Sequence, residues 1–329
     1  MGNPPPRRAH GATRNGLSQM SRKFDHVAML LGGLSAEREV SLNSGKECAD
    51  ALEEAGYRVS RVDVGPDIAD QLKSLKPDVC FNALHGKWGE DGCMQGLLET
   101  LAIPYTHSGV LASALAMHKE QAKIVLAAAG VPVAESIVVA RKNVVQEHQM
   151  ARPYVIKPVA EGSSVGVYIV NKEHNAPPMK IAEEGDGEDE LMIERYIPGR
   201  ELTSAVVGDT VLGVTEILPA EGLDFYDYEA KYAEGGSKHV LPANISSNIY
   251  RSIQKLALRA HKALGCRGVT RTDFRFDDQS GGAGELICLE VNTQPGMTVT
   301  SLVPELARHH GWTFGDLVCW IVEDASCHR

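Results

Sequence analysis

The chain has 329 residues, 43% of them hydrophobic, and a formal net charge of −10 at pH 7. This length accommodates two or three domains with cores of their own. The negative charge disfavours general binding to nucleic acid or to an anionic membrane, while leaving room for a local basic pocket. No run approaches the roughly 18 uninterrupted apolar residues of a membrane span, so we expect no membrane association.

The first 23 residues differ in composition from the rest. Met1 to Lys23 is rich in Pro, Gly and Arg and contains no acid, which predicts a disordered tail, with Met20 as a possible functional start. The seven cysteines form no CxxC pair and fall mostly in apolar patterns. This usage is typical of reduced core cysteines, so we expect a cytoplasmic protein.

Strands alternate with helices in the next part of the chain. The apolar run Val27 to Leu31 ends at Gly32-Gly33 and precedes a helix with Cys48, Leu52 and Ala55 on one face. We expect further elements at 58–64 (strand), 68–75 (helix) and 79–82 (strand). This order predicts a doubly wound parallel sheet, with the loops at 32–33 and 84–92 at the ligand-binding carboxyl ends of strands.

Beyond Pro132 the pattern changes from helical to strand-like. Helices are expected over 109–129 and 252–264, and strands at 154–157, 165–170, 191–194, 202–207 and 211–218. These predict an α+β region. The acidic stretch 183–190 is predicted to be an exposed turn. Residues 222–239 are polar and aromatic without clear periodicity, which is typical of a lid loop.

A hairpin near the C-terminus carries the strongest chemical signal. Side chains alternate along a strand, so Arg271 shares a face with Asp273, and Glu290 shares one with Asn292. Closing the hairpin would place Asp273 near Cys288 and diagonal to Glu290, at roughly 7 Å between Cβ atoms. Oxygen ligands of this kind suit Mg²⁺. The same pattern also fits an ordinary solvated strand face.

Two further segments favour anion binding. The turn at 292–298 leads to Ser301, a good N-cap for a helix over 302–310 that Gly311 would end, and a helix N-terminus suits an anion. Lys157 precedes the Gly- and Ser-rich turn 158–166, which could grip a phosphate or be a plain β-turn. The chain has no GxxxxGK[ST], and no GxGxxG follows the first strand. Residues 191–197 could hold an adenine ring or simply connect domains.

Six segments together carry a family resemblance: Gly32–Ser41, Ala83–Gly86, Glu161–Gly166, Phe225–Tyr232, Arg271–Asp273 and Glu290–Thr298. They resemble the D-alanine–D-alanine ligases of the ATP-grasp superfamily. The resemblance covers Phe24 to about Asp324, in order. It implies a three-domain ATP-grasp architecture, α/β and α+β, with domains at 24–107, 108–194 and 195–329 and a lid at 222–239.

The resemblance also implies a reaction. A cytoplasmic homodimer would join two D-alanines at the expense of ATP through an acyl phosphate, for peptidoglycan synthesis. Two Mg²⁺ ions, replaceable by Mn²⁺, would be held by Asp273, Glu290 and Asn292. Arg271 would stabilise the acyl-phosphate oxygens. The phosphates would meet three lysines, Lys119, Lys157 and Lys231.

The family's substrate-binding residues map onto this sequence as well. Glu37 would bind the ammonium of the first D-alanine, linked across the closed lid to Ser163 and Tyr232. His85 would orient that substrate. Without the resemblance, Glu37 would be a surface acid and His85 a structural residue. The acceptor carboxylate would meet Ser301 and Leu302. The nucleoside would be held by Glu194, Arg195, Ile197 and Glu201.

Three alternative functions remain open from the sequence. A related ligase could use D-lactate or D-serine as the second substrate, although Tyr232 and the lid sequence favour a dipeptide product. A nucleotide-binding regulatory protein could share the fold. An ATP-grasp ligase for another carboxylate is the third, but the Glu37 and Ser301 pockets suit a small zwitterion.

Overall fold

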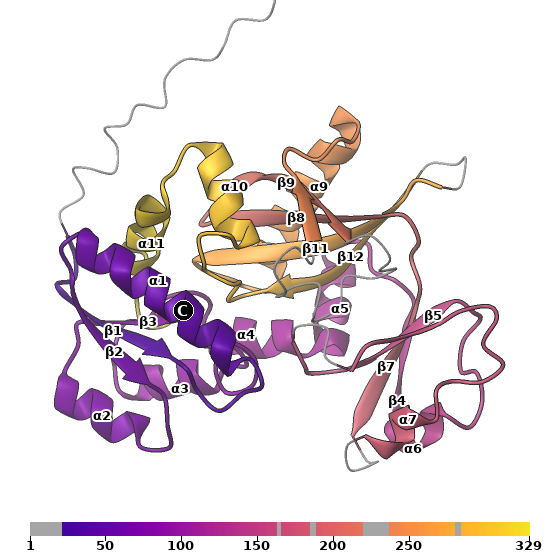
Figure 1. Cartoon of the computed structure of the whole chain (residues 1–329), viewed down its shortest axis with the longest axis horizontal. Coiled ribbons are helices and arrows are strands. Elements are labelled where there is room, and N and C mark those ends of the chain that lie inside the picture. The colour runs from indigo at the N-terminus through magenta and orange to yellow at the C-terminus, as the bar shows by residue number, and fades with distance from the viewer. Residues whose placement is uncertain (1–21, 163–165, 185–188, 220–236, 280–283) are drawn as a thin grey trace, which may run out of the picture.

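Three β-sheets organise the chain in a computed structural model that describes residues 22–162, 166–184, 189–219, 237–279 and 284–329. Figure 1 shows the sheets in three lobes, coloured from indigo at the N-terminus to yellow at the C-terminus. The lobes follow the predicted order of domains, whose exact boundaries stay a prediction. Most of the predicted tail, and the predicted site residues Ser163, Lys231 and Tyr232, lie outside the described residues.

The N-terminal sheet is parallel and covered on both faces, as predicted. Its strand order is β2 (Arg58–Asp63), β1 (His26–Leu31) and β3 (Val79–Asn82). Val27 and Met29 face a core with α1 (Arg38–Glu54), whereas Ala28 and Leu30 face α2 (Ile68–Leu75) and α3 (Cys93–Thr100). Because both faces are buried, all six residues of β1 are buried, which explains its unbroken apolar character.

The central sheet is antiparallel and has a small core of its own. Its strands lie in the order β4 (Ser136–Ala140), β7 (Glu190–Arg195), β5 (Tyr154–Pro158) and β6 (Tyr168–Val170), beside α6 (Arg141–Val144) and α7 (Lys180–Glu183). Ile156, Ile181 and Ile193 are buried together between these elements. The predicted acidic turn at 183–190 is wrong at both ends, because Glu183 belongs to α7 and Glu190 to β7.

The C-terminal sheet has five antiparallel strands. They are β10 (Ser237–Val240), β9 (Thr210–Pro219), β8 (Arg200–Val207), β11 (Val269–Asp277) and β12 (Glu285–Asn292). One face packs on α4 (Val110–Met117), α5 (Lys119–Ala128) and α9 (Ser247–Ala263), and the other on α10 (Leu302–His310) and α11 (Phe314–Glu323). The bounds of α10 and of its end at Gly311 agree with the prediction.

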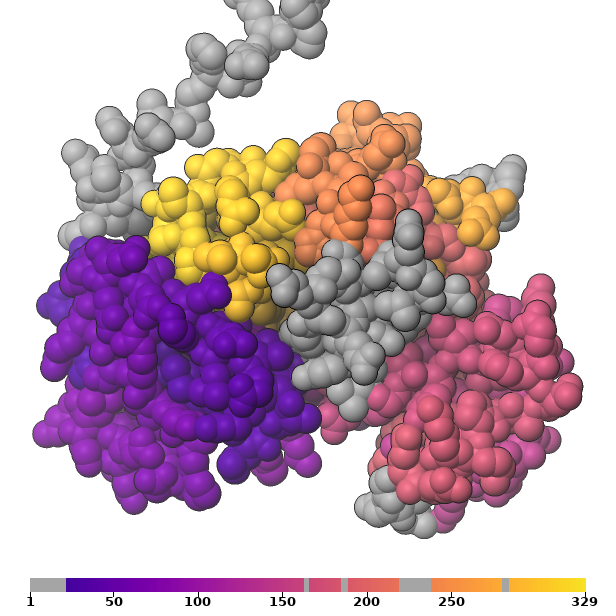
Figure 2. All heavy atoms as spheres, in the orientation of Figure 1, coloured from indigo at the N-terminus to yellow at the C-terminus, as the bar shows by residue number. Residues whose placement is uncertain are grey.

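One hydrophobic core joins the N-terminal and C-terminal lobes. Met29 and Phe81 of the parallel sheet are buried with Leu317 and Ile321 of α11, and Ala205 of the five-stranded sheet belongs to the same cluster. Figure 2 shows these two lobes in contact along a broad front, with the central lobe at the opposite end of the molecule. The first and last parts of the chain are therefore folded as one unit.

Other boundaries also differ from the sequence prediction. Residues 237–239, placed in the lid, belong to β10 and pair with β9. Helix α9 begins at Ser247 because Ser246 caps it, five residues before the expected start. At the predicted tail's end, Arg22 stacks on Tyr57 and the Lys23 amide donates to Glu323 at 2.8 Å, so these two residues are bound to the fold.

Within the described part of the chain, no helix combines the length and apolarity that crossing a membrane requires.

Candidate functional site

The β11–β12 hairpin brings its two carboxylates closer together than the sequence suggested. Asp273 lies directly opposite Glu290, and Phe274 opposite Cys288. The expected pairing of Asp273 with Cys288 is wrong, because Leu289 is an extra residue that forms a bulge. Directly opposed residues have Cβ atoms only about 4.5–5.5 Å apart, so both carboxylates lie within reach of one ion.

Asp273 is buried and held by three neighbours. Its carboxylate accepts hydrogen bonds from Arg271 Nε at 2.9 Å, from Thr203 Oγ1 at 2.6 Å and from Asn292 Nδ2 at 3.1 Å. Arg271 also donates through Nη2 at 2.8 Å, which makes the contact bidentate. The predicted metal residues thus lie in one cluster, and Asp273 is oriented before any ligand binds.

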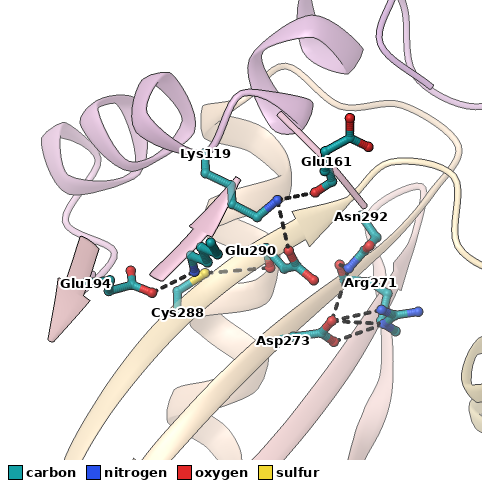
Figure 3. A network of polar contacts seen from close by, with 9 residues as sticks. Lys119, Glu161, Glu194, Arg271, Asp273, Cys288, Glu290 and Asn292 are labelled. Atoms are coloured by element: carbon teal, nitrogen blue, oxygen red, sulfur yellow. Dashed lines mark hydrogen bonds and ion pairs between the residues drawn. The ribbon is translucent and has the colours of Figure 1, made fainter. Parts of the chain in front are cut away.

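A lysine lies between the hairpin and the central lobe. Lys119, the first residue of α5, donates to the backbone oxygen of Glu161 at 2.5 Å and lies 3.8 Å from Glu290. Figure 3 shows the Lys119 ammonium group between Glu161 and Glu290. The Glu161 oxygen belongs to the Gly- and Ser-rich turn after β5, so one cation lies between the turn and the carboxylates, as phosphate binding would require.

Lys157 and Glu194 form a buried ion-pair group with a residue that the sequence analysis missed. Glu194 accepts from Lys157 Nζ at 2.6 Å and from Lys123 Nζ at 2.5 Å, and its residue is only 3% exposed. Burial alone would raise the pKa of Glu194, but the two ammonium groups outweigh it and hold the pKa below its usual range. Lys123 is 71 residues from Glu194 in sequence, and no local pattern marks the contact.

The other predicted nucleoside residues line the connection from β7 to β8. Arg195 pairs with Glu285 of β12 at 2.6 Å, while Ile197 is buried and its carbonyl accepts from Arg275 at 3.1 Å. Glu201 lies 3.5 Å from the same Arg275. Ion pairs thus tie this connection to the C-terminal sheet.

Glu37 is a buried residue of the N-terminal lobe, so its interpretation as a surface acid is wrong. It precedes α1 and is 7% exposed. A Cβ atom added at Gly86 would lie 2.5 Å from its Oε2, and one at Gly162 would lie 2.9 Å from it. Glycines from the N-terminal and central lobes therefore make the space that the carboxylate occupies.

Glu90 is a second acid beside Glu37 that the sequence analysis did not select. It accepts from the Gly86 amide at 3.1 Å. Burial, and then repulsion from Glu37, raise the pKa of Glu90 to about 8. Glu90 is therefore largely protonated near neutral pH.

His85 lies between α1 and the turn that leads to α10. Its Nε2 is 3.4 Å from Ser44 Oγ, and the same hydroxyl accepts from the Met297 amide at 3.3 Å. Gln294 donates through Nε2 to the carbonyl of Leu84. Burial lowers the pKa of His85 to about 4, so the ring is neutral at physiological pH. We call Ser44 and Gln294 the brace, because they join residues 84–85 to residues 294–297.

Ser301 and Leu302 begin α10, as predicted. Ser301 adopts extended N-cap geometry, and its Oγ accepts from the Thr298 amide at 3.1 Å, within the preceding turn. Leu302 is buried against Ile217. The first-turn amides of a helix have no partners within the helix, so this end can receive a carboxylate.

Family models match most of the chain. The model described as "D-ala D-ala ligase C-terminus" matches residues 125–323, and the one described as "D-ala D-ala ligase N-terminus" matches residues 65–108. A D-alanine–D-alanine ligase of Parvibaculum lavamentivorans is 64% identical over 305 residues, covering 92% of this chain and 98% of the relative. One from Rhizobium meliloti is also 64% identical, covering 92% and 99%.

Solved structures agree with this similarity. The D-alanine–D-alanine ligase of Bacillus anthracis complexed with ATP superposes with a TM-score of 0.76 at 28% identity, covering 91% of this chain and 96% of that one. A second structure of the Bacillus anthracis ligase gives a TM-score of 0.76 at 30% identity, with the same coverage. The chain belongs to the D-alanine–D-alanine ligase family and has its ATP-grasp fold.

Proposed function

We propose that this chain joins two D-alanines into D-alanyl-D-alanine while converting ATP to ADP and phosphate, as a supplier of peptidoglycan precursors. The observation that carries the proposal is the gathering of Asp273, Glu290 and Lys119 beside Arg271. In a phosphoryl transfer to a carboxylate, the substrate is the nucleophile. The protein therefore needs this kind of charge arrangement more than a nucleophilic side chain of its own. Family membership at 64% identity supports the same substrate pair.

The donor set fits two Mg²⁺ ions. Asp273 and Glu290 are directly opposed, and Asn292 adds an amide oxygen next to them, so the ligands are all oxygen. Bound Mg²⁺ would neutralise phosphate charge during transfer, and Mn²⁺ accepts similar ligands. Arg271, which holds Asp273 in the free protein, would then also face the acyl-phosphate oxygens.

The donor D-alanine would bind between Glu37 and the Arg271 end of the hairpin. Glu37 supplies the negative charge for its ammonium group, and protonated Glu90 adds no second charge. Lys119 and Lys157 would bind the phosphates from the central lobe. By the family resemblance, Ser163, Lys231 and Tyr232 would complete this side on closure.

The acceptor D-alanine would place its carboxylate at the start of α10, at Ser301 and Leu302. Its amine would then face the acyl phosphate across the turn at residues 293–298. The brace fixes the position of this turn relative to residues 84–85. Attack by the amine forms the peptide bond and releases phosphate.

A substrate panel tests the function. The purified protein is incubated with MgATP and D-alanine, L-alanine, D-serine or D-lactate, and phosphate release and products are followed by colorimetry and mass spectrometry. We expect rapid phosphate release with D-alanine alone and a product of two D-alanine units. Faster turnover of D-alanine with D-lactate than with D-alanine alone would assign a depsipeptide ligase instead.

We further propose a cytoplasmic location and a homodimeric assembly. The requirement for ATP and the reduced cysteines support the first, and the family resemblance supports the second. Sedimentation equilibrium of the purified chain at micromolar concentration should give twice the monomer mass. A monomer mass at that concentration would contradict the dimer.

A further inference from the structure

We propose that Lys123 is the counter-ion that lets Lys157 leave Glu194 and move to the nucleotide phosphates. The proposal rests on the nucleotide site proposed above. It assigns Lys123 a positioning role, in which this residue acts through its contact with Glu194.

The first argument is the charge of the buried group. Glu194 carries one negative charge, and the two lysines at 2.5 and 2.6 Å carry two positive charges. The side chains of Lys123, Lys157 and Glu194 are 8%, 10% and 4% exposed. One ammonium group suffices to neutralise the carboxylate, so the second is in excess and remains available for an anion.

The second argument decides which lysine moves. Lys157 lies at the end of β5, directly before the turn that contains Glu161, and it feels the negative charge of Glu290. Lys123 lies one helical turn after Lys119 in α5, within the packed side of that helix. Figure 3 shows Glu194 at one end of the polar cluster and Asp273 at the other, with Glu290 between them. Because Lys157 comes four residues before Glu161 of that turn, we take it to be the lysine that moves toward the proposed phosphate site.

The third argument is the cost of moving Lys157 without Lys123. A buried carboxylate that loses its only cationic partner is strongly destabilised. In a chain lacking Lys123, phosphates would compete with Glu194 for the single ammonium group. With Lys123 present, Glu194 keeps a partner at 2.5 Å throughout, so nucleotide binding exchanges one paired arrangement for another.

Four variants test this exchange: Lys123→Met, Lys123→Arg, Glu194→Gln and the double variant K123M/E194Q. Dissociation constants of MgATP and MgADP are measured by calorimetry without D-alanine, together with thermal melting. K123M should weaken MgATP binding about tenfold, which corresponds to about 1.4 kcal/mol. K123R should recover most of the loss, because it restores the positive charge.

The double variant distinguishes the exchange from simple packing. E194Q removes the charge that retains Lys157, so K123M/E194Q should bind MgATP more tightly than K123M. Equal or weaker binding by the double variant would overturn the proposal, as would unchanged binding by K123M. K123M alone leaves a buried acid with one partner fewer. If this variant does not melt cooperatively, the double variant is compared with E194Q. The two should bind MgATP equally, and weaker binding by the double variant would overturn the proposal.

Lys262→Met is the matched control. Lys262 pairs with Asp209 at 2.8 Å on the exposed side of α9, so its loss should change neither nucleotide binding nor turnover. The two D-alanine KM values of K123M should also stay within about twofold of wild type, because the exchange concerns the nucleotide alone. If wild type binds MgATP but forms no dipeptide, the proposed function fails while the exchange is still tested.

Discussion

The two junctions between lobes are built from different interactions. The N-terminal lobe meets the C-terminal lobe through a hydrophobic core that includes Phe81 and Ile321. The central lobe meets the C-terminal sheet through a small apolar cluster, Ala134, Ile197 and Ile287, and through polar contacts such as the Arg195–Glu285 ion pair. Lys119 of α5 lies between the Glu161 backbone oxygen of the central lobe and Glu290 of β12. The first junction lies beside the residues proposed to bind D-alanine, and the second lies beside the residues proposed to bind the nucleotide.

This difference suggests separate mechanical roles. Apolar burial is non-directional and is lost only by exposing large areas to water, so the first junction should stay closed throughout turnover. Ion pairs at partly exposed positions contribute little net stability and exchange readily with a charged ligand. We therefore expect the central lobe to move against a rigid unit formed by the other two.

The largest expected effect concerns the ionic junction at Glu290. Glu290→Gln should lower kcat about 10³-fold, because it removes a metal ligand at the point where charge develops. The melting temperature should change little. Glu285→Gln, on the same strand but paired with Arg195, is the matched control and should retain most activity. Activity of E290Q above half of wild type at millimolar Mg²⁺ would contradict the metal assignment.

The apolar junction is tested by cavity formation. Ile321→Ala should lower the free energy of unfolding by about 3 kcal/mol, since the side chain is fully buried in the shared core. Hydrogen exchange should then accelerate in β1 and β3 as well as in α11. Ile181→Ala, equally buried in the central core, should accelerate exchange only in the central lobe. If I321A left β1 and β3 as protected as in wild type, the two lobes would not fold as one unit.

Glu90 gives a smaller effect that depends on pH. Its pKa rises from the usual 4.5 to about 8 in the folded chain, so the folded state binds more protons between these values. Wild-type stability should therefore fall as pH rises through this interval. Glu90→Gln carries no such proton, so it should melt near the wild-type temperature at pH 5 and above it at pH 8.

The matched control for this titration is Glu54→Gln, at an exposed position of α1. Melting curves of the three proteins at both pH values provide the comparison. An E90Q difference that is the same at pH 5 and pH 8 would show that Glu90 is ionised across the range.

The smallest effect is expected at Arg195. Its ion pair with Glu285 is 38% and 45% exposed at the two side chains. Arg195→Gln should therefore cost no more than about 1 kcal/mol of stability, and the difference from wild type should shrink at 1 M salt. A loss that is larger, or that persists at high salt, would mean that this junction is not held by screened charges.

Local patterns in the sequence predicted much of the fold. The bounds of α2, β3 and α10 agree with the expectation. Helix α10 ends at Gly311 because the backbone there is left-handed, which favours glycine. The register of β11 and β12 could not be predicted, because a single extra residue, Leu289, shifts all later pairs. Hairpin periodicity contains no signal for such a bulge.

For the candidate site, the sequence predicted positions best on single strands and turns, and the roles of the residues stay predictions. Asn292 ends β12 and Ser301 caps α10 as expected, whereas Asp273 lies opposite Glu290 and not Cys288. Lys123 and Glu90 were missed because their importance depends on burial and on partners from other elements. Glu37 was identified only through the family resemblance, since its burial depends on glycines of two different lobes.

The brace has a practical meaning for anyone who wishes to redirect the enzyme toward a different second substrate. Residues 294–302 are the segment proposed to bind the second substrate. If this segment came from a relative with a different residue at position 294, the hydrogen bond from Gln294 to the Leu84 carbonyl would be lost. The exchange would also set a foreign backbone amide against Ser44, whose hydroxyl lies next to His85. A chimera that exchanges only residues 294–302 would thus displace the residues proposed to bind the first D-alanine. A successful exchange should therefore include helix α1 and residues 84–85 from the same relative.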